Sequence, residues 1–573
     1  MMKLGRKTGS VVAIAALVAG VVATVPSASA ATSFAGPAPA IKGAVKGGTL
    51  NIFNQADFEH IDPARNYVGG TLDFYRFFTR SLLNYRTYEG KTELLPDIAA
   101  DMGTASNNSK TWTFKLRTNL KWEDGSKITC ADLKYGTMRS FADDILTGGT
   151  TYAKDFLENP NGYTGPYKQP NADLPSIICS PKGDSITYKL SQPVPYFQSL
   201  VAYGSFAPIK KSKDTKEKYD NRPFSSGPYK IEKYNRGKDL TLVRNNQWDP
   251  KTDPTRWNYP DKIVVKFGSD QAVIENGLVS DTGAYKTGMS GDTELVANLS
   301  KVVGNAAYKS RFLQFQSPYS RHYLINMDTV KDLNVRKAIQ CAIDYKTVIN
   351  AAGGSNVGSP SNSMIPSSLS NAYRKFNICG RDTTKNPEAQ VTAAKDFLSK
   401  ATTKPDKLTV AFRDKGTEKA RAAAVGAALE AAGFTVVLKE YPAASYYTAI
   451  AVRDANQPDV IQGSWGYDWA AATGIVLALL DGRTMSATDA KSNYSRQNDP
   501  AIQALFAATD LMTDVKKSDK ALGDIEQKVI QDLAAVVPVY MQIANVIVGS
   551  KVGGVQQEGG FGTVSPAAAY IKK

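Results

Sequence analysis

Short runs in the first half of the chain alternate between apolar and polar residues. The run TWTFKLR at 111–117 places Trp112 and Phe114 on one side and polar residues on the other. This is the period of a strand with one buried face. The run at 225–245, SSGPYKIEKYNRGKDLTLVRN, contains two more alternating segments with Gly237 between them, which predicts a turn that joins two strands.

Other segments have the spacing of helices. The run ITCADLKYGTMRSFADD begins with Thr129 as a candidate cap, and Asp132 three residues later favours the free N–H groups of a first turn. Apolar residues from Leu333 to Ile349 follow helical spacing on one face. In contrast, the Pro-, Gly- and Asn-rich stretch from Asn159 to Pro175 predicts a long surface loop.

The second half of the chain alternates strands and helices. KLTVAFRD at 407–414, a helix from about Thr417 to Ala432 stopped by Gly433, and FTVVLKEY at 434–441 form a strand, helix, strand unit. A crossover of this length joins parallel strands. A further helix from about Tyr446 to Arg453 leads to the run PDVIQGSW, which we expect to be a third strand.

The tail from Ala521 to Gln542 reads ALGDIEQKVIQDLAAVVPVYMQ. We expect a helix that ends at Pro538 and passes into a last strand returning to the first half of the chain. A chain that crosses twice between two lobes forms a hinge, so we expect one here.

The stretch SWGYDW at 464–469 follows the predicted third strand. It sets Asp468 among Trp465, Tyr467 and Trp469, while Gly466 allows the backbone to bend. Ligands of open α/β sheets bind beyond the carboxyl ends of parallel strands, so we expect these residues to line a ligand site. The alternative for Asp468 is a turn or cap residue bonded to nearby backbone N–H groups.

Length and composition predict a globular protein of several parts. A chain of 573 residues exceeds the size of one hydrophobic core, so we expect at least two lobes. The N-terminus has the features of a secretory signal peptide over 1–30: early cations, an apolar run from Val11 to Val25 and the small residues of a cleavage site ending at Ala30. A tether over 31–43 follows. Fifteen apolar residues are too few to span a bilayer comfortably.

In an exported protein the four cysteines are candidates for disulfide bonds, because thiols outside the cytosol tend to pair. We favour Cys130 with Cys179 and Cys341 with Cys379, since each pair closes a loop within one candidate domain, and free buried thiols are the alternative. The first of them lies far beyond the cleavage site, so no cysteine for a lipid anchor is expected there. No metal or cofactor is predicted, because the chain has two histidines and no Cys-x-x-Cys.

Charge and motifs restrict the function further. The formal charge is +15, but the cations are scattered without a basic stripe, so nucleic acid is not an expected partner and a negatively charged envelope is a better one. Arg413 is expected to be solvated or ion-paired inside the protein rather than bound to a ligand. His60 and His322 are interpreted as ordinary histidines. A secreted hydrolase is disfavoured, because no motif places a reacting pair or triad, and an adhesion protein would show no ligand-dependent closure.

Four stretches, in this order, carry a resemblance to a known family: TWTFKLRTNLKWEDGSKITCADLKYG, SSGPYKIEKYNRGKDLTLVRN, YLINMDTVKDLNVRKAIQCAIDYKTVI and GSWGYDW. The chain resembles the extracellular solute-binding proteins of ABC importers, of the oligopeptide- and dipeptide-binding type (family 5), over nearly all of its mature length. The resemblance implies an α/β, two-lobed periplasmic-binding-protein-like fold (type II, cluster C) with an extra domain in the first lobe. The implied parts are a first lobe at 44–88, 222–307 and 535–573, an extra domain at 89–221, and a second lobe at 308–534.

The resemblance also implies a function. Peptide-binding members use an aspartate after a tryptophan to receive the peptide's terminal ammonium, and Asp468 matches that position. The expected protein is a monomeric receptor at the cell envelope that captures a peptide by closing its lobes and passes it to a membrane permease. The family often continues with a tyrosine and a proline-containing turn, whereas WAAATG follows here. Because other members bind nickel complexes or oligosaccharides, a non-peptide solute is the alternative.

Overall fold

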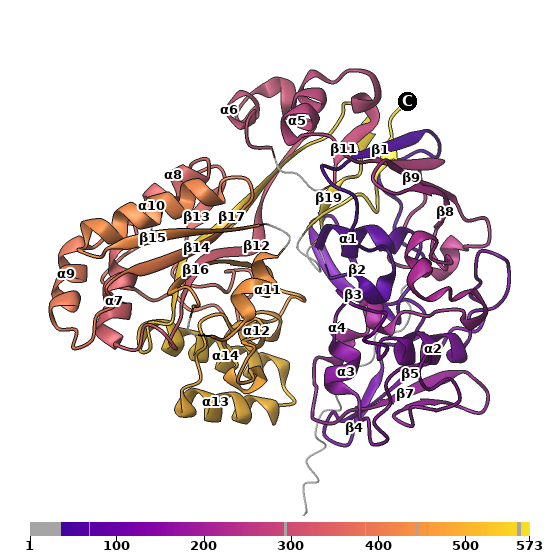
Figure 1. Ribbon diagram of the computed structural model, residues 1–573. Coiled ribbons are helices and arrows are strands. Elements are labelled where there is room, and N and C mark those ends of the chain that lie inside the picture. Colours follow the sequence, from indigo (N-terminus) through magenta and orange to yellow (C-terminus); the bar gives the residue numbers. More distant parts are fainter. Residues whose placement is uncertain are drawn as a thin grey trace, which may run out of the picture.

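The protein consists of two halves that are joined at one end by long strands (Figure 1). The computed structural model describes residues 36–67, 69–291, 295–383, 385–442, 445–454, 456–558 and 563–573. The predicted signal peptide and the start of the predicted tether lie outside these residues. Within the described ranges, no helix combines the length and apolar character that a membrane span requires.

A mixed five-stranded sheet forms the upper part of the first half. Its order is β11-β1-β10-β9-β8, and β1 is parallel to both β10 and β11. The turn at Gly237, which has a φ of 71°, joins β8 to β9 as predicted. The strands are β1 (Thr49–Phe53), β8 (Tyr229–Asn235), β9 (Asp239–Arg244), β10 (Lys262–Lys266) and β11 (Gly288–Ser290).

A four-stranded antiparallel sheet forms the lower part of the first half, in the order β4-β5-β7-β6. As predicted, Trp112 and Phe114 on β5 are buried, and Thr129 and Asp132 form a capping box at the start of α2. The elements of this part are β4 (Thr104–Ser106), β5 (Thr111–Lys115), β6 (Ile177–Cys179), β7 (Ser185–Lys189), α2 (Cys130–Arg139), α3 (Tyr152–Phe156) and α4 (Phe197–Leu200).

One continuous hydrophobic cluster joins the two sheets of the first half. It includes Leu50 and Ile263 of the five-stranded sheet together with Phe114 and Ile186 of the four-stranded sheet. The hairpin of β2 and β3 contributes to it, and the boundary predicted at residue 88 falls in the turn of this hairpin. The domain boundaries therefore stay predictions. The remaining elements of this half are α1 (Gly69–Phe74), β2 (Leu83–Tyr88), β3 (Lys91–Pro96), α5 (Gln271–Ser280), α6 (Leu299–Val302), β18 (Val552–Gly553), β19 (Gln556–Glu558), β20 (Thr563–Ser565) and β21 (Tyr570–Ile571).

A six-stranded sheet forms the second half, in the order β13-β17-β12-β16-β14-β15. Strand β14 is parallel to β15 and to β16, which confirms the predicted unit of parallel strands. The strands are β12 (Phe312–Ile325), β13 (Gly358–Pro360), β14 (Leu408–Asp414), β15 (Val436–Pro442), β16 (Val460–Trp465) and β17 (Val536–Ile547).

Helices cover both faces of this sheet. Residues of α7, α8, α9 and α10 share one hydrophobic cluster, and residues of α11, α12, α13 and α14 share another on the opposite face (Figure 1). Their bounds are α7 (Leu333–Ala342), α8 (Tyr345–Ala352), α9 (Val391–Ser399), α10 (Glu418–Ala431), α11 (Tyr446–Ala451), α12 (Val476–Leu480), α13 (Pro500–Asp510) and α14 (Val515–Gln531).

Two predicted elements differ from the structure. The helical pattern of 333–349 is two helices, because Ile343 is extended at ψ 120° and Asp344 caps α8 by accepting from the N–H of Thr347. The helix predicted to end at Pro538 ends at Gln531, and Pro538 lies inside β17. Its position coincides with a register shift against β12, and such irregularities are where a strand tolerates a proline.

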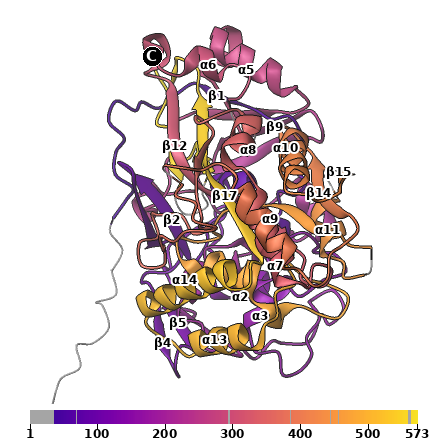
Figure 2. The ribbon, with the colours of Figure 1, turned by 90° about the vertical axis from the view of Figure 1, so that its left-hand side faces the viewer.

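The long antiparallel strands β12 and β17 run side by side through both halves (Figures 1 and 2). At one end, Leu313 and Val546 pack with the hydrophobic cluster of the first half. At the other end, Leu324 and Val536 belong to a cluster of the second half. The register between the strands is interrupted after Gln316, between these two ends. These strands are the place where the predicted hinge motion can occur.

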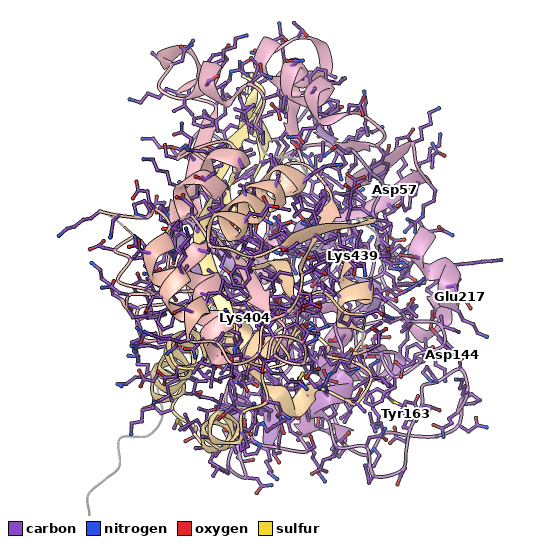
Figure 3. The ribbon with its side chains drawn as sticks, turned by 60° about the vertical axis from the view of Figure 1, so that its left-hand side comes forward. Asp57, Asp144, Tyr163, Glu217, Lys404 and Lys439 are labelled. Carbon is purple, nitrogen blue, oxygen red and sulfur yellow. A yellow bond between two sulfur atoms is a disulfide. The ribbon has the colours of Figure 1, made fainter. Side chains whose placement is uncertain are left out.

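Charged side chains of both signs cover the outside of both halves (Figure 3). Lys404 and Lys439 of the second half and Asp144 and Glu217 of the first are exposed. The surface therefore mixes cations and anions, as the scattered charges of the sequence predict.

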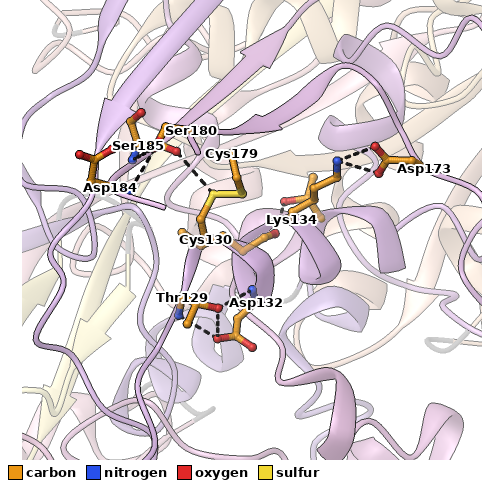
Figure 4. The surroundings of a disulfide bond; sticks show 11 residues. Thr129, Cys130, Asp132, Lys134, Asp173, Cys179, Ser180, Asp184 and Ser185 are labelled. Carbon is orange, nitrogen blue, oxygen red and sulfur yellow. Dashed lines mark hydrogen bonds and ion pairs between the residues drawn. A yellow bond between two sulfur atoms is a disulfide. The ribbon is translucent and has the colours of Figure 1, made fainter. Parts of the chain in front are cut away.

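Both disulfides pair the cysteines as we favoured. Cys130 at the start of α2 bonds to Cys179 at the end of β6 (Figure 4). Cys341 near the end of α7 bonds to Cys379, with a sequence separation of 38. The first bridge ties the four-stranded sheet to its covering helix, and the second ties α7 to the loop that follows β13.

We expect the double variant Cys341→Ser/Cys379→Ser to lower the free energy of unfolding of the second half by about 3 kcal/mol, because the bridge restricts the unfolded chain. Urea denaturation followed by circular dichroism measures this loss. The wild-type protein with reductant, which loses both bridges, should be destabilised at least as much. An unfolding free energy equal to that of the oxidised wild type would contradict a stabilising role.

Candidate functional site

The segment SWGYDW leaves the six-stranded sheet at the end of β16. Trp465 is the last paired residue, opposite Ser320 of β12. At Gly466 the chain passes over Tyr319, so that a Cβ atom at this position would lie 2.9 Å from its ring. Only glycine fits this close approach, and the bend directs the next residues toward the first half.

Asp468 contacts three tyrosines of the opposite half. Its Oδ2 accepts hydrogen bonds from the hydroxyls of Tyr67, at 2.7 Å, and Tyr152, at 2.8 Å. Its backbone carbonyl accepts from the hydroxyl of Tyr203. Within the described ranges, no backbone N–H donates to this carboxylate, so Asp468 is not the turn or cap residue of the alternative interpretation. The carboxylate of one half is held by hydroxyl donors of the other.

Trp469 packs directly against the first half. Its ring stacks on Tyr196 with centroids 5.4 Å apart and meets Tyr152 edge-on at 5.6 Å. The indole N–H donates to the hydroxyl of Thr473 at 2.8 Å, and the side chain is 4% exposed. Trp469 therefore belongs to the hydrophobic cluster of the first half although its backbone comes from the second.

The other two aromatics of the motif stay with the second half. Tyr467 is 9% exposed and lies in a hydrophobic cluster of that half. Trp465 is half-buried, packs against the same cluster, and donates from its indole N–H to the carbonyl of Gly474 at 3.2 Å. The motif thus divides between the halves, with Asp468 and Trp469 reaching across.

Burial raises the pKa of Asp468 to about 7, and the hydrogen bonds from Tyr67 and Tyr152 oppose this by stabilising the charged form. The same burial, together with the nearby carboxylate, raises the pKa values of both tyrosines well above their usual range. The tyrosines are therefore neutral donors at physiological pH, and Asp468 changes charge there.

The remaining candidate residues have internal partners. Arg413 pairs with Glu418, with Nη2 2.7 Å from the carboxylate, as expected for an internal ion pair. His322 is buried beside Ser320, and burial lowers its pKa to about 3. His60 contacts Asp220. No cluster of three or more potential metal ligands occurs among the residues that the structure describes.

Sequence reasoning missed the three tyrosines. Tyr203, Tyr152 and Tyr67 lie 265, 316 and 401 residues from Asp468 and belong to no motif. The chain contains 28 tyrosines, so composition does not distinguish these three.

Comparison with known proteins defines the class. The profile of the bacterial extracellular solute-binding proteins, family 5 Middle, matches residues 93–487, which is more than half of the chain. The protein belongs to family 5 of the bacterial extracellular solute-binding proteins, as its sequence motifs indicated.

Individual relatives cover most of the chain. The periplasmic oligopeptide-binding protein OppA of Salmonella typhimurium is 25% identical over 469 residues, covering 78% of this chain and 79% of its own. The periplasmic murein peptide-binding protein MppA of Escherichia coli is 23% identical over 493 residues, covering 84% and 85%. These relatives are binding proteins of the periplasm.

Solved structures show the same fold. The clavulanic acid biosynthesis oligopeptide binding protein 2 superposes with a TM-score of 0.84 at 26% identity, over 95% of this chain and 99% of its own. The Escherichia coli murein tripeptide binding protein MppA gives 0.73 at 19% identity, over 93% and 100%. The expected two-lobed α/β fold is confirmed.

We expect Tyr152→Phe to raise the pKa of Asp468 above its value of about 7, because the lost hydrogen bond stabilises the charged form. The carboxyl 13C shift of labelled aspartate, assigned with Asp468→Asn, reports this pKa. Tyr163→Phe is the matched control, since the buried hydroxyl of Tyr163 finds no partner among the described residues. An unchanged or lower pKa in Tyr152→Phe would contradict the assignment.

Proposed function

We propose that the protein is an exported receptor that captures oligopeptides between its halves and delivers them to the permease of an ABC importer. Family membership and the oligopeptide-binding relatives support this proposal. The observation that carries it is the carboxylate of Asp468, which stands on one half and is enclosed by the other. A charged group in this position can attract a ligand of opposite charge. Its contacts with the tyrosines form only when the halves are closed.

Asp468 receives the terminal ammonium of the peptide. Both tyrosine hydroxyls donate to Oδ2, and Oδ1 accepts no hydrogen bond from the described residues. An ammonium at Oδ1 would therefore add to the existing bonds rather than displace them. Charge-assisted hydrogen bonds of this kind contribute about 1.5 to 3 kcal/mol each.

The neighbours of Asp468 have separate roles in this proposal. Trp469 seals the contact with the first half, and Trp465 is half-buried beside the ligand. Tyr467 supports the motif from the core, while Gly466 lets Tyr319 approach the backbone. These aromatic side chains exclude water, which strengthens the ion pair.

Hinge motion at β12 and β17 links binding to transport. Ligand favours the closed form, because only there do both halves contact it. The closed form is then the signal that the permease recognises. The protein acts without turnover, as a monomer outside the cytoplasm at the cell envelope, and needs no cofactor.

Replacing Asp468 with alanine should weaken binding of free-amine oligopeptides by about 10- to 100-fold and leave the affinity for N-acetylated peptides unchanged, because only the ammonium loses its partner. Isothermal titration calorimetry with paired peptides measures both affinities. Asp396→Ala on α9, whose carboxylate pairs with Lys400 on the surface, is the control. Equal affinities of wild type and Asp468→Ala for free-amine peptides would refute the ammonium role.

The affinity for free-amine peptides should rise about tenfold per pH unit from pH 5 and level off near pH 7. With the two halves in contact, the pKa of Asp468 is about 7, so binding of an ammonium below this pH must expel a proton. Calorimetry between pH 5 and 7.5 tests this, and N-acetylated peptides should show a flat profile. A flat profile for free-amine peptides would show that Asp468 does not titrate on binding.

A further inference from the structure

The segment at 210–222 of the first half is rich in lysine and reads KKSKDTKEKYDNR. Its backbone forms two short 3-10 turns, over Lys211–Lys213 and Lys216–Asn221. Figure 3 shows Glu217 of this segment at the outer edge of the molecule. Four exposed side chains of the two turns make up what we call the lysine patch: Lys211, Lys213, Lys216 and Lys218.

The fold turns the acid in the middle of this segment inward. The side chain of Asp214 is 2% exposed, and its Oδ2 lies 3.1 Å from Nε of Arg139. The same oxygen accepts hydrogen bonds from the hydroxyls of Tyr135, at 2.8 Å, and Tyr167, at 2.6 Å. The backbone N–H of Lys216 donates to Oδ1 at 2.9 Å. The negative charge of Asp214 is therefore directed to Arg139 inside the protein and does not balance the lysines at the surface.

The lysine patch keeps a surplus of positive charge. Cations on either side of it have local partners, because Lys210 lies 2.6 Å from Asp124 and Arg222 lies 2.7 Å from Glu123. None of the four patch lysines has a carboxylate within ion-pair distance in the described part of the chain. In the segment at 210–222, which is described throughout, Glu217 is the one exposed acid. Four lysines against one glutamate leave three positive charges.

Aromatic rings beneath the patch keep its ammonium groups side by side. The pairs, with the distance from Nζ to the ring centroid, are Lys211 with Tyr135 at 5.7 Å, Lys213 with Phe224 at 5.3 Å and Lys216 with Tyr167 at 5.5 Å. These distances are within the range of cation–π contacts, which orient a cation without neutralising it. Because each ammonium stands over a different ring, the charges are spread over a surface and do not converge on one point.

We propose that the lysine patch is a docking surface for the anionic headgroups of a phospholipid bilayer. Exposed ammonium groups spread over a surface match the diffuse negative charge of a bilayer, whereas a single bound phosphate requires donors that converge on it. The long lysine stem also lets each ammonium reach outward from the protein. This inference goes beyond the proposed function: the patch holds the receptor at the membrane, where its permease lies.

Sedimentation with vesicles tests the patch. The purified protein is mixed with vesicles of phosphatidylcholine alone or with about one third phosphatidylglycerol, and the bound fraction is measured at low salt. We expect binding to the anionic vesicles only. Raising the salt to about 0.5 M should abolish it, because exposed charges are then screened. Calorimetry with soluble inorganic polyphosphate tests an anionic polymer in place of a bilayer.

Removing the patch should weaken the partition onto anionic vesicles at least tenfold. The patch variant is Lys211→Gln/Lys213→Gln/Lys216→Gln/Lys218→Gln. The control variant loses the same number of charges from exposed lysines on other parts of the surface, and it is Lys301→Gln/Lys404→Gln/Lys516→Gln/Lys528→Gln. It should partition like wild type. Circular dichroism checks that both variants are folded.

The outcomes distinguish a local surface from the net charge of the protein. Loss of vesicle binding in the patch variant but not in the control supports the proposal. No binding of wild type to anionic vesicles, or an equal loss in both variants, overturns it. Binding to polyphosphate without binding to vesicles also overturns it and assigns the patch to a polymer. No measurement here uses a peptide, so the proposed function is tested separately.

Discussion

A carboxylate can leave water only where hydrogen-bond donors replace its hydration, and for Asp468 these donors stand on the other half of the protein. Tyr67 and Tyr152 donate these hydrogen bonds, and both residues lie far from β16 in the sequence. Asp468 can therefore have these hydrogen bonds only when the two halves are in contact. The bend at Gly466 and the packing of Trp469 on Tyr152 and Tyr196 lie directly beside this contact.

Residues with strong local requirements made much of the fold predictable. Trp112 and Phe114 alternate with polar residues on β5, and the Thr129 capping box fixes the start of α2. Periodicity did not show the break at Ile343, because apolar residues continue on both sides and Asp344 suits a helix surface as well as a cap. The position of Pro538 in β17 depends on a bulge against β12, which is set by pairing between distant residues.

Some residues of the site could likewise be predicted from the sequence, and others could not. The motif around Asp468 and its location after a strand could be predicted from the chain, because acid, aromatics and glycine are neighbours in sequence. The tyrosines could not, since nothing local marks Tyr203 among the others. Sequence thus indicates the chemistry of a site, and tertiary contacts supply its partners.

The shared hydrophobic cluster of the first half limits how the protein can move. Leu50 and Phe114, on different sheets, belong to one continuous core. Swinging the four-stranded sheet away from the five-stranded one would expose that core to water, which is unfavourable in proportion to the apolar area. We therefore expect the extra domain predicted at 89–221 to stay packed on the rest of the first half and to move with it as one body whenever the two halves separate.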